Sequence, residues 1–228
     1  MLDRLIRGDV HYYEVVIPEG SNIFDVARLV AGTGLVPQDR FLQATRKDEG
    51  YLFPATYRFT RGMPVAQMRA AMRARFDQAW IDANGADDKS DVVTLASLIE
   101  TEAVQESERP LIASVFKNRL ARGISLDCDP TVVYAALLEG KYRGKIYRSD
   151  LDRQHPYNTY RTHGLPPGPI ANPGMSSLKA ALNPAESEYL FFVANPDGSG
   201  RHIFSKTNAE HNRAVAEYRR GQSNSPVN

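Results

Sequence analysis

Cysteine is almost absent from this sequence, which has Cys128 alone among 228 residues. A single cysteine excludes an internal disulfide framework and a cysteine-rich metal site. The five histidines are scattered without the spacing of metal ligands, and no glycine-rich loop of the phosphate-binding kind is present. The sequence therefore predicts neither a metal ion nor a cofactor.

Long apolar runs and a surplus of one charge are also missing. No segment approaches the roughly 18 apolar residues of a membrane-spanning helix, and Met1–Val10 lacks the apolar stretch of a secretory signal. The net charge of +1 gives no reason to expect nucleic acid or an acidic membrane surface as the main partner. We expect a soluble body of one or two domains, because 42% of the residues are hydrophobic and can form a core.

Residues 11–48 form the first of three regions. The alternating apolar stretch 11–17 is typical of a strand, and Asn22 is placed to cap a following helix. Pro37 suits the first turn of a second helix. We expect these residues to form a small subdomain of one strand and two helices.

A connecting segment at 49–90 and a larger domain at 91–220 follow. The connecting segment joins extended, aromatic residues to a helix at 65–83 that has an apolar stripe and a basic face. The larger domain is predicted to contain helices at 92–104 (capped by Asp91), 108–122, 130–138, 177–182 and 209–220, strands at 189–194 and 201–204, and an irregular stretch at 141–175. Residues 221–228 are expected to be disordered. The predicted fold class is therefore α+β.

The helix at 92–104 carries two carboxylates, Glu100 and Glu102. Helical spacing places each roughly 80° from the centre of the apolar stripe, on opposite sides, so they point apart. They cannot form the facing pair of an ordinary glycosidase. One of them can still lie at the rim of a cleft, where partial burial raises a carboxyl pKa and favours acid catalysis. The alternative is that both are solvated residues on the flanks of the helix.

The irregular stretch offers groups that suit a sugar. Residues 155–160 supply two aromatic faces, an amide and a hydroxyl, and the Pro- and Gly-rich residues 164–173 can form a stiff cleft wall. A surface loop or a polyproline ligand remains the alternative. Cys128 lies between Asp127 and Asp129, whose charges would weaken it as a nucleophile. Asp129 before a proline is explained as a helix-start residue.

Ten short motifs follow one another along the chain. They are residues 49–54 (EGYLFP), 95–102 (LASLIETE), 107–110 (SERP), 113–120 (ASVFKNRL), 126–134 (LDCDPTVVY), 156–160 (PYNTY), 164–174 (GLPPGPIANPG), 181–184 (ALNP), 189–193 (YLFFV) and 202–205 (HIFS). This ordered series resembles the YceG-like family, the MltG endolytic murein transglycosylases, over residues 11–220. Each motif alone is weak, and the ordered set is specific.

The resemblance implies a LysM-like subdomain at 11–48 followed by a catalytic domain. It implies cleavage of the MurNAc-β-1,4-GlcNAc bond within peptidoglycan strands, which leaves 1,6-anhydro-MurNAc ends and terminates strand elongation. The first glutamate of the Leu/Ile-Glu-x-Glu helix, Glu100, would be the single catalytic acid/base. Substrate-binding candidates are Tyr157, Asn158, Thr159 and Tyr160, with Glu102 and Glu108 as further supporting residues.

Members of this family are normally tied to the inner membrane by an N-terminal helix and work on its periplasmic face beside peptidoglycan synthases. This chain lacks the anchor, so we expect a soluble portion of such a protein. Cys128 stands where threonine or serine is commoner, and we expect no chemistry from it. Two other functions stay open, namely a muramidase that cuts the same glycan with water and a non-catalytic peptidoglycan-binding scaffold.

Overall fold

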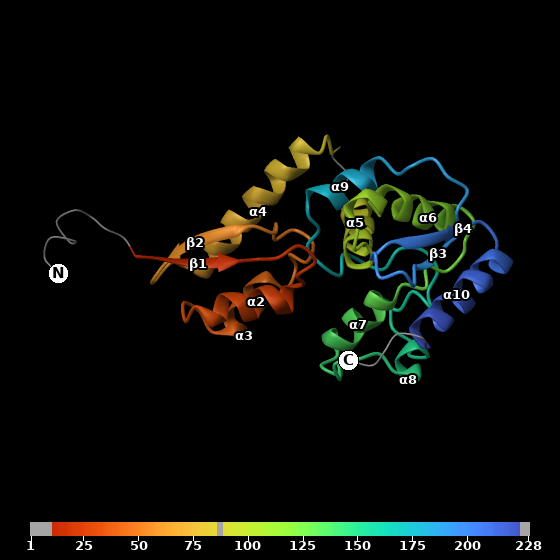
Figure 1. The fold of residues 1–228 in the computed structure, drawn as a ribbon. Coiled ribbons are helices and arrows are strands. Elements are labelled where there is room, and N and C mark those ends of the chain that lie inside the picture. Colours follow the sequence, from red (N-terminus) through yellow and green to blue (C-terminus); the bar gives the residue numbers. More distant parts are fainter. Residues whose placement is uncertain (1–10, 86–88, 224–228) are drawn as a thin grey trace, which may run out of the picture.

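The structure, a computed structural model, describes residues 11–85 and 89–223 and has two lobes (Figure 1). The N-terminal lobe contains β1 (Tyr12–Val16), α2 (Ile23–Gly32), α3 (Gln38–Thr45), β2 (Thr56–Thr60) and the first half of α4 (Val65–Asp82), whose second half packs in the core of the C-terminal lobe. The C-terminal lobe contains α5 (Ser90–Glu102), a 3₁₀ turn (Glu106–Glu108), α6 (Arg109–Ala121), α7 (Asp129–Leu138), α8 (Arg148–Leu151), α9 (Met175–Leu182), β3 (Phe191–Ala194), β4 (His202–Ser205) and α10 (Asn208–Ser223). The predicted α+β class is confirmed.

The N-terminal lobe is built around one antiparallel strand pair. β1 pairs with β2, with Tyr12 opposite Thr60. The Asn22 side chain accepts hydrogen bonds from the first backbone N–H groups of α2, as the sequence predicts. Met68 and Met72 of α4 are fully buried in the same core as the strands. Residues 56–72 therefore belong to this lobe rather than to a separate connection, because strand pairing and burial join parts that are distant in sequence. A LysM likeness of the lobe stays a prediction.

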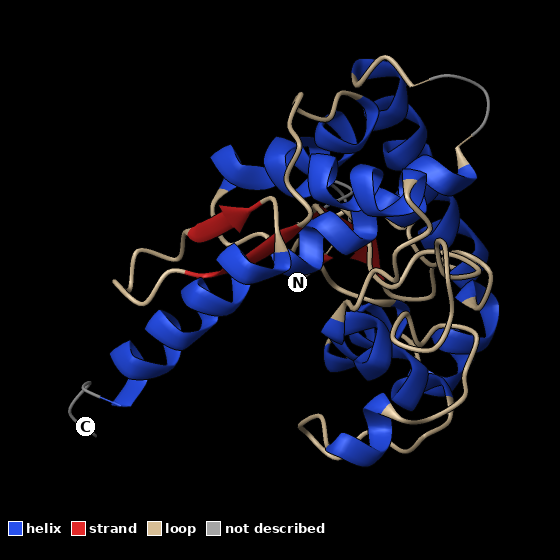
Figure 2. Cartoon of the chain, turned by 90° about the vertical axis from the view of Figure 1, so that its right-hand side faces the viewer, coloured by secondary structure: helices blue, strands red, loops and turns tan. Residues whose placement is uncertain are grey.

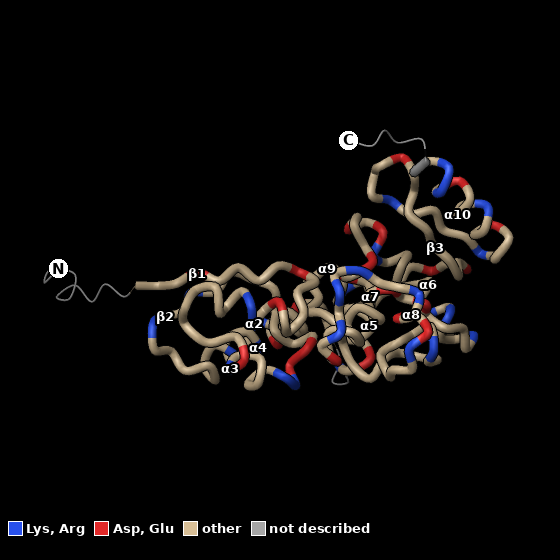
Figure 3. Tube along the Cα trace, turned by 90° about the horizontal axis from the view of Figure 1, so that it is seen from below, with Lys and Arg blue, Asp and Glu red and all other residues tan. Residues whose placement is uncertain are grey.

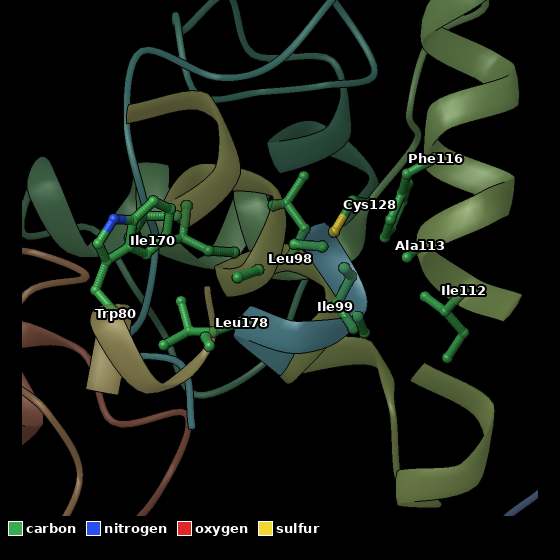
Figure 4. Close-up of a cluster of buried hydrophobic side chains, with 14 of the residues drawn as sticks. Trp80, Leu98, Ile99, Ile112, Ala113, Phe116, Cys128, Ile170 and Leu178 are labelled. Atoms are coloured by element: carbon green, nitrogen blue, oxygen red, sulfur yellow. The ribbon is translucent and has the colours of Figure 1, made fainter. Parts of the chain in front are cut away.

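The C-terminal lobe packs around α5. Leu98 and Ile99 of α5 are fully buried, with Ile112 of α6 on one side and Leu178 of α9 on another (Figure 4). Contacts with α7 complete the surroundings of this helix. α5 is therefore packed against three helices, α6, α7 and α9.

A two-stranded hairpin and the last helix close the lobe. β3 and β4 pair antiparallel, with Phe191 opposite Ser205, as the hairpin prediction requires. The helix leading to the C-terminus, α10, runs beside these strands (Figure 2). It continues to Ser223, so Gly221–Ser223 are helical, contrary to the predicted disorder. At Gly221 an added Cβ would lie 2.5 Å from Pro196, which shows how closely the helix packs on the hairpin turn.

Two further expectations need adjustment. Lys89 rather than Asp91 is the N-cap of α5, and Asp91 lies in the first helical turn, where an acidic side chain interacts favourably with the helix dipole. The irregular stretch at 141–175 contains the short helix α8. Predictions for Met1–Val10, for 86–88 and for 224–228 fall outside the described residues.

A buried polar junction joins the lobes. Asn172, fully buried, accepts a hydrogen bond from Leu52 N at 2.8 Å and donates one to Ser21 O at 2.7 Å. Glu49 accepts a hydrogen bond from Ile23 N at 3.0 Å, and the Tyr134 hydroxyl donates to its carboxylate. Gly20 N also donates to Asn172 O at 3.0 Å, and a Cβ added at Gly20 would lie 3.7 Å from Glu100 Cγ, so the junction places the turn at residues 18–20 beside α5. Within the described ranges, no helix is long and apolar enough to cross a bilayer.

Candidate active site

Glu100 and Glu102 leave α5 in different directions, as helical spacing predicts. The Glu100 carboxylate accepts hydrogen bonds from Arg109 Nη2 at 2.7 Å and from Gly174 N, before α9, at 2.9 Å. Its side chain is only 4% exposed. Glu100 is thus enclosed in an ion pair that links α5 to α6 and α9.

The N-terminal lobe reaches this ion pair through Glu19. Glu19 Oε2 lies 3.7 Å from Arg109 Nη2, and burial together with the negative charge of Glu100 raises the pKa of Glu19. A Cβ at Gly174 would lie 1.8 Å from Glu19 Oε1, so any larger residue there would displace this carboxylate. Two carboxylates from different lobes therefore share one buried arginine.

Glu102 lies on the opposite flank, beside α7. Cys128 Sγ donates a hydrogen bond to Glu102 Oε1 at 3.2 Å. Burial raises the pKa of Glu102; the hydrogen bond from Cys128 lowers it in part, and the negative charge of Asp129 adds a smaller raising effect. A carboxyl group in this environment keeps its proton to higher pH than an exposed one. Glu102 therefore has the electrostatic character of a general acid.

Glu102 lines a cavity of about 410 Å³. Asp129, Tyr160, Phe192 and His211 are also in its wall. The Tyr160 hydroxyl donates a hydrogen bond to Asp129 Oδ1 at 2.6 Å. Aromatic faces next to a few polar groups are the composition expected of a sugar site.

A second cavity of about 680 Å³ adjoins the first, because both are lined by Asp129 and Tyr160. Its other lining residues include Tyr147, Arg148 and Arg161, from α8 and the irregular stretch. Figure 3 shows basic and acidic positions interspersed around α8. The two cavities together form an extended cleft past Glu102, which suits a polymer better than a small molecule.

Two of the four predicted substrate-binding residues in the loop 157–160 are buried inside the protein. Asn158 is 1% exposed, and its side-chain amide donates to the carbonyl oxygens of Leu151 and Arg153. Thr159 is fully buried and accepts a hydrogen bond from Cys128 N. Both side chains are used inside the protein: Asn158 holds the loop to the end of α8, and Thr159 holds it to the start of α7. Substrate binding by Asn158 and Thr159 stays a prediction. Their burial does not favour it.

Tyr157 and Glu108 also make internal contacts. The Tyr157 ring packs against Tyr134, with ring centroids 5.1 Å apart. Glu108 accepts hydrogen bonds from His202 N, at 3.0 Å, and from the His202 ring, so it anchors β4 to the 3₁₀ turn. Among the predicted site residues, Glu102 and Tyr160 share the cavity wall.

The sequence did not indicate that Arg109 pairs with Glu100, or that Asp129 lines the cleft. Nothing local distinguishes Arg109, because its partner Glu100 is nine residues earlier and Glu19 belongs to the other lobe. Asp129 lies at the start of α7, as expected, but as its first residue rather than as its cap, which is Cys128, and it also lines the cleft. The pKa of Cys128 is raised, as expected, mainly by burial and by Glu102 rather than by the flanking aspartates.

No cluster of three or more candidate metal ligands occurs in the described part of the chain.

Comparisons with known proteins agree on one family. Residues 1–217 match the YceG-like family. The chain is 34% identical to an endolytic murein transglycosylase of Bacillus subtilis, over 96% of this chain and 69% of that protein. It is 32% identical to an endolytic murein transglycosylase of Streptococcus pneumoniae, over 75% of this chain and 32% of that protein. A crystal structure of a YceG-like protein from Listeria monocytogenes superposes with a TM-score of 0.73 at 32% identity, over 93% of this chain and 79% of that one.

Proposed function

We propose that this chain, which belongs to the YceG-like family, is an endolytic murein transglycosylase. It cleaves the MurNAc-β-1,4-GlcNAc bond within peptidoglycan strands, leaves 1,6-anhydro-MurNAc ends and so terminates strand elongation. The observation that carries this proposal is a buried carboxyl group with a raised pKa at the wall of an extended cleft. The names of the two curated relatives point to the same reaction.

Two carboxylates compete for the role of acid. The family resemblance assigns it to Glu100, whose carboxylate accepts hydrogen bonds from Arg109 and Gly174. The position of Glu102 favours it for this role, because it lines the wall of the cleft beside Tyr160 and its burial raises its pKa, which suits a general acid. We therefore propose Glu102 as the acid/base and Glu100 as the residue that fixes α5, with the reverse assignment kept as the alternative.

The reaction needs one carboxyl group that changes role. Protonated Glu102 donates to the glycosidic oxygen as the C1–O4 bond breaks. The resulting carboxylate then accepts the proton of the C6 hydroxyl as O6 attacks C1, so no water is consumed. The nucleophile belongs to the same sugar, and its high effective molarity replaces an activated water. One carboxyl group for proton transfer agrees with the separation of Glu102 from Glu100.

Product analysis tests the reaction. Purified sacculi digested with the protein should release fragments with anhydro ends, which are lighter by one water than reducing ends. Reducing ends alone would indicate a muramidase that uses water. Binding to sacculi without any new ends, at neutral or mildly acidic pH, would indicate a scaffold.

The raised pKa of Glu102 adds a pH test. The acid must be protonated in the reacting enzyme, so turnover should decline as pH rises through this pKa. A rate that stays constant into the alkaline range would contradict a carboxyl acid. We propose, from the family resemblance, that the protein acts on the periplasmic face of the inner membrane with peptidoglycan synthases as partners.

A further inference from the structure

Asp129 occupies the point where three cavities meet. It lines the Glu102 cavity, the larger cavity beside α8, and a third of about 230 Å³ that reaches Gly20 of the N-terminal lobe. Asp129 is exposed, whereas the pKa of Glu102 is raised mainly by its burial. The cleft thus holds two carboxyl groups in contrasting environments.

The orientation of Asp129 is fixed from both sides. It begins α7, and Tyr160 donates to its Oδ1 at 2.6 Å. Thr159 links this loop to α7, since its hydroxyl accepts from Cys128 N at 3.0 Å and lies 3.0 Å from the Thr131 hydroxyl. Within residues 11–85 and 89–223, Asp129 Oδ2 has no hydrogen-bond partner. One oxygen is therefore held while the other remains available to a ligand in the cleft.

We infer that Asp129, positioned by Tyr160, faces the sugar ring under cleavage and stabilises the positive charge that develops on it. This inference rests on the proposed function. Cleavage of a glycosidic bond passes through an oxocarbenium-like transition state, which a fixed negative charge stabilises more than it does the neutral substrate. Asp129 forms no bond to C1, because the C6 oxygen is the nucleophile.

The charge of Asp129 has a second effect, on Glu102. It is one of the causes that raise the pKa of Glu102. Removing it should therefore lower that pKa and move the alkaline decline of turnover to lower pH. This shift reports that Asp129 lies near Glu102, whereas a fall in kcat with KM nearly unchanged reports its action on the transition state, which a residue that only started a helix would not cause.

The test compares Asp129→Asn with Asp127→Asn. Asp127 is a matched control because it is an exposed acid two residues away that pairs with Arg119 at 3.2 Å, and its positive φ of 51° suits asparagine. Anhydro ends released from purified glycan strands are measured for kcat, KM and pH dependence. Asp129→Asn should lower kcat by about 10- to 10³-fold with KM nearly unchanged. It should also move the alkaline decline to lower pH, and Asp127→Asn should leave that decline in place.

Tyr160→Phe and Asp129→Glu complete the design. Tyr160→Phe removes the hydroxyl that holds Asp129 and should lower kcat less than Asp129→Asn does. Asp129→Glu should recover part of the activity. A folded Asp129→Asn protein with wild-type kcat, or with an unmoved alkaline decline, overturns the inference. If Asp129→Asn does not fold, wild-type kcat in Tyr160→Phe overturns it. Wild-type protein without anhydro products would instead overturn the proposed function.

Discussion

Glu49 should make the protein less stable as pH rises. Burial raises its pKa from the ordinary value of 4.5 to about 7, against the lowering by its hydrogen bonds from Ile23 N and Tyr134. A carboxyl group with a raised pKa in the folded state binds its proton more tightly there than in the unfolded chain. The favourable contribution is fully present below pH 4.5 and is lost as pH rises through about 7. The difference corresponds to roughly 3 kcal/mol of unfolding free energy.

The substitution Glu49→Gln should remove most of this pH dependence, because the amide keeps an acceptor for Ile23 N and carries no charge. Urea unfolding of the whole chain at about pH 5 and about pH 8 measures the effect. The wild-type protein should lose stability between these pH values by more than Glu49→Gln does. Glu14→Gln is the control, because Glu14 is an exposed strand residue paired with Arg58. An equal loss in wild type and Glu49→Gln would refute the reasoning.

Two other substitutions test the Glu100 ion pair. Arg109→Gln leaves the enclosed carboxylate without its cation and should cost about 3–5 kcal/mol of unfolding free energy; a loss below about 1 kcal/mol in urea unfolding would contradict this structural role. Gly174→Ala places a methyl group where the half-exposed Glu19 carboxylate lies; this side chain can swing away, so the cost should be the loss of its contact with Arg109, at most about 1 kcal/mol. The same change in a Glu19→Ala background should cost much less, and equal costs in both backgrounds would mean that the contact between lobes is not formed.

The sequence predicted the directions of the two glutamates on α5 but not their surroundings. Helical periodicity alone places Glu100 and Glu102 on opposite flanks. Their partners are Gly174, before α9, and Cys128, before α7, which are 74 and 26 residues away. No local pattern could therefore show which carboxylate is enclosed and which faces a cavity.

The predicted extent of the N-terminal subdomain shows the same limit. The apolar stripe of α4 predicts that the helix packs on something, and Met68 and Met72 are indeed fully buried. The sequence could not show that they pack on the β1–β2 pair, because strand pairing over more than 40 residues leaves no local trace. Likewise, the composition of residues 155–160 suited a sugar site, but the internal hydrogen bonds of Asn158 and Thr159 depend on backbone groups elsewhere, the Leu151 carbonyl and the Cys128 N–H.

The most direct test of the account compares Glu102→Gln with Glu100→Gln in the same assay of anhydro ends. Glu102→Gln should keep its fold and lower turnover by about 10²- to 10⁴-fold, as expected for a lost acid/base. Glu100→Gln should lower the unfolding free energy, because it weakens the contacts to Arg109 and Gly174, and it should keep much more turnover. A folded, inactive Glu100→Gln beside an active Glu102→Gln would contradict the account and return the catalytic role to Glu100.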